Sequence, residues 1–383
     1  MKKIGIISEL TISNSVNYGN KIQGYALNKY LNDNFSEYDT YSIILSKNQK
    51  MLFTKFYMPP FLYDMFINLK LFLKRFKKNR TIDLIRKREK TINCFVKKHI
   101  KLYSKIVKYN DFKKMDFDYY IVGSDVVWAQ NDKTINKIKF LKFNTKKEIK
   151  KISYAASFGR DYIPKNNVKY IKEYLSDYYK ISLREKSSVK MLNDIGINDV
   201  YHVCDPALLL TKEEWSSIEI NPNITNEKYI FVYLLGKSSE QREYINKFAK
   251  NNKLRIINIP HANGKYNQVD DDFGDYKYND CSVENWIWLI HNADYVFTDS
   301  FHGLVLSSIF QKKFIVVKRL YDVDINNRII DYLSTIHQED KFLTLEKDLD
   351  LKKIKWDYIQ IKKELEIFIS NSKNYLENAL NNK

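Results

Sequence analysis

A polar turn that carries a histidine is the first candidate for chemistry in this sequence. The turn reads Thr298-Asp299-Ser300-Phe301-His302-Gly303 and joins an apolar strand to an apolar helix. In parallel α/β folds, ligands bind beyond the carboxyl ends of the strands, and this turn lies at such an end. An imidazole there can act as a general acid or bind a phosphate. We therefore expect His302 to belong to a functional site.

Two arginines also follow apolar strands. Arg184 comes directly after the strand expected at 180–183, and Arg328 follows the last strand of the second half. The planar guanidinium group forms forked hydrogen bonds with carboxylates and phosphates, which a lysine ammonium group cannot do. Each arginine is either an anion-binding residue that points into a cleft or a paired surface residue, and spacing alone leaves both open.

Two further turns combine glycine with polar side chains. Asn17-Tyr18-Gly19-Asn20 precedes a helix, whose free N–H groups attract an anion, and the glycine lets the backbone approach it closely. Gly123-Ser124-Asp125 follows the strand expected at 119–122. Asp125 can act as a base or orient a sugar hydroxyl, although either polar residue of this turn can instead cap a helix.

The order of apolar runs predicts the elements that position these turns. Strands are expected at 4–7, 119–122, 152–156, 180–183 and 200–203, then at 229–235, 255–259, 295–298 and 314–317. Helical periodicity lies between them, and the strands are too uniformly apolar for a sheet with one open face. The sequence predicts an α/β fold with two Rossmann-like parallel-sheet domains facing a cleft. We place these domains at 1–210 and 211–335, followed by a helical tail at 336–383.

The composition indicates a folded protein. The 383 residues include 64 Lys or Arg and 46 Asp or Glu, a net charge of +18, and 44% are hydrophobic, which excludes a disordered chain. No apolar run is long enough to span a membrane, and the apolar run after Met1 is too short for a secretory signal. The cysteines Cys94, Cys204 and Cys281 are too far apart for a disulfide framework or a CxxC zinc site. We expect a cytoplasmic location and disfavour Cys204 as a nucleophile.

The positive charge is concentrated in one segment. Residues 70–114 hold 17 Lys or Arg and only three acidic residues, and residues 51–76 just before them are rich in large apolar side chains. This pattern is typical of a segment that binds an anionic membrane surface. It is also typical of a helical insertion, at about 51–115, whose apolar face covers the core. No zinc knuckle, RNA-binding motif or helix-turn-helix supports a nucleic-acid partner.

Taken together, these motifs resemble the polysaccharide pyruvyl transferase family. In the family's order they are the turn at 17–20 with Gln23, the turn at 123–125 with Trp128, and Ser182-Leu183-Arg184-Glu185 with Ser188. Asp205-Pro206-Ala207-Leu208-Leu209-Leu210, the turn at 298–303 and Asn327-Arg328 complete the set. The resemblance implies a two-domain fold similar to GT-B glycosyltransferases. It also implies transfer of pyruvate from phosphoenolpyruvate to a pair of sugar hydroxyls as a cyclic ketal, with no metal or organic cofactor.

The resemblance assigns roles to the candidate residues. Pyruvyl transfer needs a general acid, a base and cationic groups on two anions. The catalytic candidates are His302, Asp125 and Arg184, and the substrate-binding candidates are Asn17, Gly19, Asn20, Gly123, Ser124, Ser300, Gly303 and Arg328. Ser300 stands where other members of the family carry arginine, so we expect either that Arg184 or Arg328 compensates for it or that the donor differs. The expected acceptor is a sugar or lipid-linked oligosaccharide, with the enzyme peripheral at the inner face of the cell membrane through 51–114.

Two other functions fit the same sequence. A GT-B glycosyltransferase that uses a nucleotide sugar would share the cleft and the phosphate site. Asp322-Val323-Asp324 has the spacing of a DxD metal motif, but we interpret it as incidental because GT-B enzymes generally do without one. A non-catalytic membrane-surface component of polysaccharide assembly is the second alternative, and it would bind liposomes without binding either donor.

Overall fold

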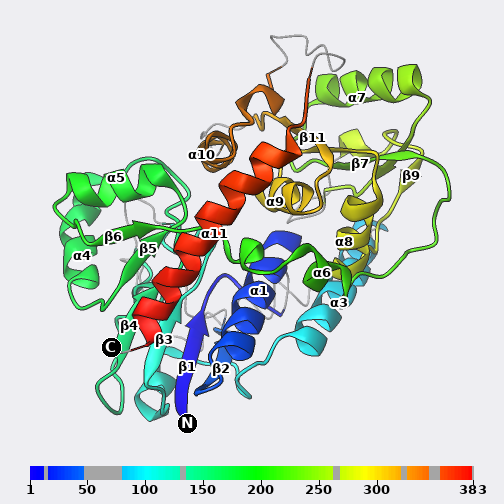
Figure 1. Cartoon of the computed structure of the whole chain (residues 1–383). Coiled ribbons are helices and arrows are strands. Elements are labelled where there is room, and N and C mark those ends of the chain that lie inside the picture. Colours follow the sequence, from blue (N-terminus) through cyan, green and yellow to red (C-terminus); the bar gives the residue numbers. More distant parts are fainter. Residues whose placement is uncertain are drawn as a thin grey trace.

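The computed structural model describes residues 1–12, 16–46, 80–129, 135–261, 268–320, 326–344 and 354–381. Within them the chain forms two parallel sheets with helices around them (Figure 1). The Asp322-Val323-Asp324 sequence and residues 51–79 of the predicted insertion lie outside the described residues.

The N-terminal sheet has the strand order β2-β1-β3-β4 and is entirely parallel. Its strands are β1 (Lys2–Ile7), β2 (Tyr38–Ile43), β3 (Tyr119–Val122) and β4 (Lys150–Ser153). Isolated parallel bridges from Ile152 to Lys180 and from Ala156 to Leu183 continue it to β5 (Ile181–Leu183), which pairs with β6 (Val200–His202). Every residue of β3 is buried, as expected for a sheet covered on both faces.

The C-terminal sheet has the order β12-β11-β10-β7-β8-β9, again with all pairs parallel. Its strands are β7 (Tyr229–Tyr233), β8 (Arg255–Asn258), β9 (Tyr276–Lys277), β10 (Tyr295–Thr298), β11 (Lys313–Val317) and β12 (Phe342–Leu343). The sequence analysis located the central strands β7, β8, β10 and β11, which are apolar runs. Three strands were not predicted: β2, which polar residues interrupt, and the edge strands β9 and β12, which are only two residues long.

Helices connect the strands, as parallel pairing requires. They are α1 (Tyr18–Asn34), α3 (Arg80–His99), α4 (Lys165–Leu175), α5 (Lys186–Asp194), α6 (Lys212–Ser216), α7 (Ser239–Asn252), α8 (Val283–Asn292), α9 (Phe301–Ile309), α10 (Asn327–Thr335) and α11 (Tyr358–Leu380). No described helix is both long and apolar enough to cross a bilayer.

Helix α3 shows what the described part of the basic segment does. Its inner face contributes Ile92, Phe95 and Val96 to the core, and it contacts both α1 and α8. Arg88 is buried as well, where its guanidinium group donates to the carbonyls of Pro260 and Asn279, at 2.7 and 2.6 Å. At least the 80–99 part of the segment is therefore a structural helix that links the two halves of the molecule.

The C-terminal helix α11 returns from the C-terminal half to the N-terminal sheet (Figure 1). The Tyr375 hydroxyl donates to the Ser153 carbonyl at 2.8 Å, and the Ser372 hydroxyl accepts from the Cys204 amide at 2.8 Å. One hydrophobic cluster, which includes Ile4, Trp286 and Leu376, runs through both halves. The halves thus share a core, and the boundaries at 210 and 335 stay a prediction.

Candidate functional site

The turns singled out in the sequence bring groups from both halves together. Arg184 follows β5 of the N-terminal half, and Phe301 begins α9 of the C-terminal half. The Arg184 guanidinium lies 4.4 Å from the centre of the Phe301 ring. His302 follows Phe301, and its Nε2 lies 3.4 Å from the carboxylate of Asp205. We call Asp125, Arg184, Asp205, His302 and Arg328 the interdomain cluster.

Arg184 is almost completely neutralised by carboxylates. Its Nε donates to Glu185 at 2.8 Å and its Nη1 to Asp205 at 3.2 Å, while Asp125 lies 4.0 Å from Nη1. Burial alone would lower the pKa of this guanidinium, but Glu185, Asp205 and Asp125 together raise it above its ordinary value. The remaining nitrogen, Nη2, is buried and has no hydrogen-bond partner. A fixed cation with one free donor nitrogen is suited to binding an anion.

Arg328 has the opposite electrostatic surroundings. It lies half-buried in the first turn of α10, and its Nε is buried without a partner. Its pKa is lowered to about 10, first by burial and then by the neighbouring Arg319 and Arg184, and Asp125 and Glu185 offset only part of this effect. Three guanidinium groups therefore converge here, and an anionic ligand would relieve their repulsion.

Hydrogen bonds between the two halves position α10 and therefore Arg328. The Asp331 carboxylate accepts from the amide and the hydroxyl of Ser187, at 3.2 and 3.1 Å, in the first turn of α5. The Asn327 amide donates to Asp161 at 3.0 Å. A cavity of about 10 Å³, enough for one water molecule, lies between α10, Arg184 and Phe301.

Asp205 is the residue of the interdomain cluster to which the sequence analysis gave no role. It is fully buried, and its Oδ2 accepts from the Ser124 hydroxyl at 2.9 Å and from Arg184. Burial alone would raise the pKa of this carboxyl, but His302 and then Arg184 hold it well below its usual range. The signal for it was present, because Asp205 lies in the Asp205-Pro206 motif directly after a strand.

His302 packs directly against the start of α1. A Cβ atom added to Gly19 would overlap the Nδ1 atom of His302 and would lie 2.9 Å from two ring carbons. Real Cβ atoms do not approach other atoms so closely, so a glycine is required at this position. Gly19 therefore has a steric role in this structure, since its missing side chain makes room for the imidazole.

Asp125 has an unusual backbone conformation. Its φ is +70°, in the left-handed region that residues other than glycine rarely adopt, and its side chain is buried. Its carbonyl accepts from the Val127 and Ser157 amides, at 2.6 and 3.1 Å, and these bonds hold the conformation. Such strain is concentrated at functional sites, which makes Asp125 a candidate on structural as well as sequence grounds.

The remaining predicted residues have local structural contacts. Asn17 and Ser300 are the N-caps of α1 and α9, accepting from the amides of Asn20 and Gly303 at 3.3 and 3.4 Å. A Cβ on Gly303 would lie 2.7 Å from the Thr298 hydroxyl, so this glycine lets α9 pack on β10.

Of the predicted residues Gly123, Ser124 and Asn20, only Asn20 has a polar atom without a partner in the protein. A Cβ on Gly123 would lie 3.2 Å from Ser8 Cβ, so Gly123 packs closely in the core. Ser124 caps no helix and donates to Asp205 instead. The Asn20 amide nitrogen donates to the Glu9 carbonyl at 3.2 Å, and its oxygen is buried without a partner, which leaves one acceptor for a ligand.

Arg319 is a second functional candidate that the sequence analysis missed. It follows β11 and pairs with Asp299, whose carboxylate lies 3.1 Å from its Nε and also accepts from the Leu235 and Gly236 amides, each at 2.7 Å.

Cys204 gains no support as a nucleophile. Burial raises the pKa of its thiol to about 11, so the thiolate is scarce at neutral pH.

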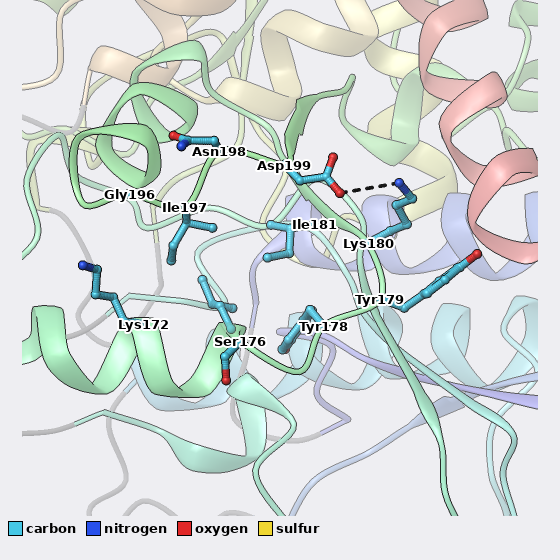
Figure 2. A pocket seen from close by; sticks show the side chains of 11 residues that line it. Lys172, Ser176, Tyr178, Tyr179, Lys180, Ile181, Gly196, Ile197, Asn198 and Asp199 are labelled. Atoms are coloured by element: carbon cyan, nitrogen blue, oxygen red, sulfur yellow. Dashed lines mark ion pairs between the residues drawn. The ribbon is translucent and has the colours of Figure 1, made fainter.

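A second pocket lies away from the interdomain cluster. Figure 2 shows this pocket, of about 410 Å³, between the end of α4 and the turn before β6, with Lys172, Ile181, Ile197 and Asp199 among its lining. It lies at the amino ends of β5 and β6, opposite the end that carries Arg184.

Among the described residues, no group of three His, Cys, Asp or Glu side chains could hold a metal ion.

Comparisons with known structures agree with this architecture. The Staphylococcus aureus MnaA–UDP co-structure has a TM-score of 0.50 and 12% identity, covering 98% of this chain and 90% of that one. A Listeria monocytogenes protein described as a UDP-N-acetylglucosamine 2-epimerase has a TM-score of 0.50 and 10% identity, covering 99% and 90%. At such identities the likeness concerns the fold, and it confirms the predicted GT-B-like arrangement.

Sequence comparison identifies the family. No curated protein shows a significant match to this chain. The family model for polysaccharide pyruvyl transferase, however, matches residues 17–321, a range that includes Asp125, Arg184, Asp205 and His302. This match confirms the resemblance seen in the motifs: the chain belongs to the polysaccharide pyruvyl transferase family.

Proposed function

We propose that this protein transfers pyruvate from phosphoenolpyruvate to two hydroxyls of one sugar in a polysaccharide or its lipid-linked precursor. Both hydroxyl oxygens bond to C2 of the donor, and the C2–O bond to phosphate breaks. One hydroxyl proton is balanced by the proton added at C3, which becomes a methyl group, and the other by the proton on the released phosphate. No oxidant, reductant or metal is needed to balance this reaction.

The roles follow from the interdomain cluster. Arg184 and Arg328 would bind the carboxylate and phosphate of the donor, and His302 would act as the general acid. Asp125 would orient or deprotonate the acceptor hydroxyl. The observation that carries the proposal is the pair of unpartnered guanidinium nitrogens, Arg184 Nη2 and Arg328 Nε. The two arginines come from different halves and line one small cavity with Asp205, whose carboxylate also contacts His302.

A donor screen tests the proposal. Phosphoenolpyruvate should raise the melting temperature of the protein, whereas a panel of nucleotide sugars should not. Phosphate should then be released from phosphoenolpyruvate in the presence of a lipid-linked oligosaccharide acceptor. Stabilisation by a nucleotide sugar alone would favour a glycosyltransferase and contradict the proposal.

His302→Gln tests the assignment of the general acid. The variant should keep its fold and lose phosphate release by about 10²–10⁴-fold, the usual contribution of general acid catalysis. His291→Gln is the matched control, because His291 lies on α8 and pairs with Glu219 at 2.9 Å, away from the interdomain cluster. Near-normal turnover in His302→Gln would remove this residue from the mechanism.

We also propose that the outer face of α3 holds the enzyme at an anionic membrane. Its inner face is buried, while five basic side chains along the helix are exposed: Arg86, Lys87, Lys90, Lys97 and Lys98. A row of cations on one helix face is attracted to anionic lipid, by about 1 kcal/mol for each residue near the surface.

Liposome co-sedimentation tests this placement. Binding to vesicles of anionic lipid should weaken with added salt and should fall when Lys90, Lys97 and Lys98 are replaced by Glu. The same number of charge reversals at Lys190, Lys362 and Lys363, on α5 and α11, is the matched control. Equal loss in both triple variants, or binding that salt does not affect, would contradict a role for α3.

A further inference from the structure

The Asp205 carboxylate joins the two halves of the interdomain cluster through one oxygen atom. Its Oδ2 accepts from the Ser124 hydroxyl at 2.9 Å and from Arg184 Nη1 at 3.2 Å, both in the N-terminal half. The same oxygen lies 3.4 Å from His302 Nε2 in the C-terminal half. The other oxygen, Oδ1, accepts from the Ala207 amide at 3.0 Å, which fixes the plane of the carboxylate.

The contact with His302 is an ion-pair contact without the alignment of a hydrogen bond. The Nε2 atom is buried and has no hydrogen-bond partner, although Asp205 is close to it. A proton on Nε2 is therefore attracted by the carboxylate without being held in a hydrogen bond to it. This differs from a histidine whose nitrogens are both engaged by the protein, which has no proton left to donate.

The surroundings leave Asp205 as an anion with two cationic partners. Tyr154, Cys204 and Tyr332 also lie near it, but burial raises the pKa of all three groups, so they carry no charge at neutral pH. The other acids near Arg184 are Glu185, 2.8 Å from its Nε, and Asp125, 4.0 Å from its Nη1. The negative charge of Asp205 therefore acts mainly on Arg184 and His302.

We propose that Asp205 is the positioning residue for His302, holding its imidazole in a fixed place relative to the Arg184 guanidinium. This inference rests on the proposed function, in which His302 donates a proton and Arg184 binds the donor. Asp205 itself would not touch the substrate. Gly19 completes the arrangement from the other side, because only a glycine there leaves room for the ring.

A double-mutant cycle on turnover tests the inference. Asp205→Asn removes the charge and keeps the shape, and it should lower kcat for phosphate release by at least tenfold while changing KM for phosphoenolpyruvate less. The double variant Asp205→Asn/His302→Gln should be no slower than His302→Gln alone, because Asp205 acts through the histidine. Two losses that multiply in the double variant would overturn the inference.

Ser124→Ala is the matched control. It removes a neutral donor from the same Oδ2 atom and leaves the charge, so its kcat should fall much less than that of Asp205→Asn. Equal losses in the two variants would show that hydrogen bonding around Asp205, and not its charge on His302, is what matters.

A second cycle needs no donor and separates this inference from the proposed function. The melting temperatures of the two single variants and the double variant should be non-additive, because each substitution removes the same contact. Failure of the unsubstituted protein to release phosphate would overturn the proposed function, while this cycle would still report the pairing. Additive losses would overturn the pairing itself.

Discussion

Arg184 and Arg328 point into the same site from different halves of the molecule, yet their surroundings are opposite. Three carboxylates surround Arg184 and raise its pKa, whereas burial and two other arginines lower that of Arg328 to about 10. Arg184 is thus part of the protein's own charge balance, and Arg328 carries a charge that the protein leaves uncompensated. The difference suggests that Arg184 is locked in place before the ligand arrives and that the ligand supplies the missing partner of Arg328.

Arg184→Met is the substitution with the largest expected effect. The substitution leaves the buried carboxylates of Asp205 and Glu185 without their cation, which typically costs about 3–5 kcal/mol. We expect a lower free energy of unfolding in urea together with loss of phosphate release. A variant that is inactive yet as stable as the parent would show that the carboxylates do not depend on Arg184.

Gly19→Ala disturbs the site without changing any charge. The added methyl group must displace the His302 ring, so we expect turnover to fall about 100-fold or more while both arginines stay in place. Gly24→Ala is the control on the same helix, because its Cβ would lie 3.3 Å from the flexible end of Leu10. Steady-state assays that give both variants the same turnover would contradict the steric role of Gly19.

Arg328→Met tests whether the charge of Arg328 is uncompensated in the protein. Removing an uncompensated cation should leave the melting temperature unchanged or raise it, the opposite of Arg184→Met. Phosphoenolpyruvate affinity, measured by calorimetry, should weaken about 10-fold, as expected for the loss of one charge-assisted hydrogen bond. A clear drop in stability would mean that the protein itself already neutralises Arg328.

The smallest expected effect is on pH dependence. A cation loses its anion-binding charge as pH rises through its pKa, so donor affinity should fall about twofold between pH 8 and pH 10 through Arg328. The sign for stability is the reverse: because folding lowers this pKa, the folded state gains stability as pH rises above about 10. Arg328→Met should abolish the Arg328 part of both trends. An unchanged affinity profile in that variant would exclude Arg328 as the titrating group.

Much of the site could be predicted from the sequence, because apolar runs show where the strands end. Arg184, His302 and Asp125 each follow an apolar run, and parallel topology collects such residues at one edge of each sheet. Asp205 and Arg319 occupy equivalent places, but Asp205 was named only as part of a motif and Arg319 was not named. Aspartate before proline is typical of a turn, and an arginine after a strand is often at the surface, so neither pattern by itself distinguishes a functional residue.

Helix α3 shows the same limit of sequence information. The sequence shows that residues 70–114 are rich in basic residues, but it does not show which of these side chains face water. Arg88 is buried against backbone carbonyls of the C-terminal half, whereas Lys87 and Lys90, on either side of it, are exposed. Net charge is additive along the chain, but burial depends on which face of the helix meets the core.

The sequence by itself determined the two parallel sheets, the family and the turns that carry the candidate residues, because these depend on local hydrophobic periodicity and on motif order. Only the tertiary structure decided how the cluster works. It placed Asp205 between Arg184 and His302, although Asp205 and His302 are 97 positions apart in the chain. It also left the charge of Arg328 unbalanced. Distances between residues far apart in the chain set these charges, and no local pattern encodes them.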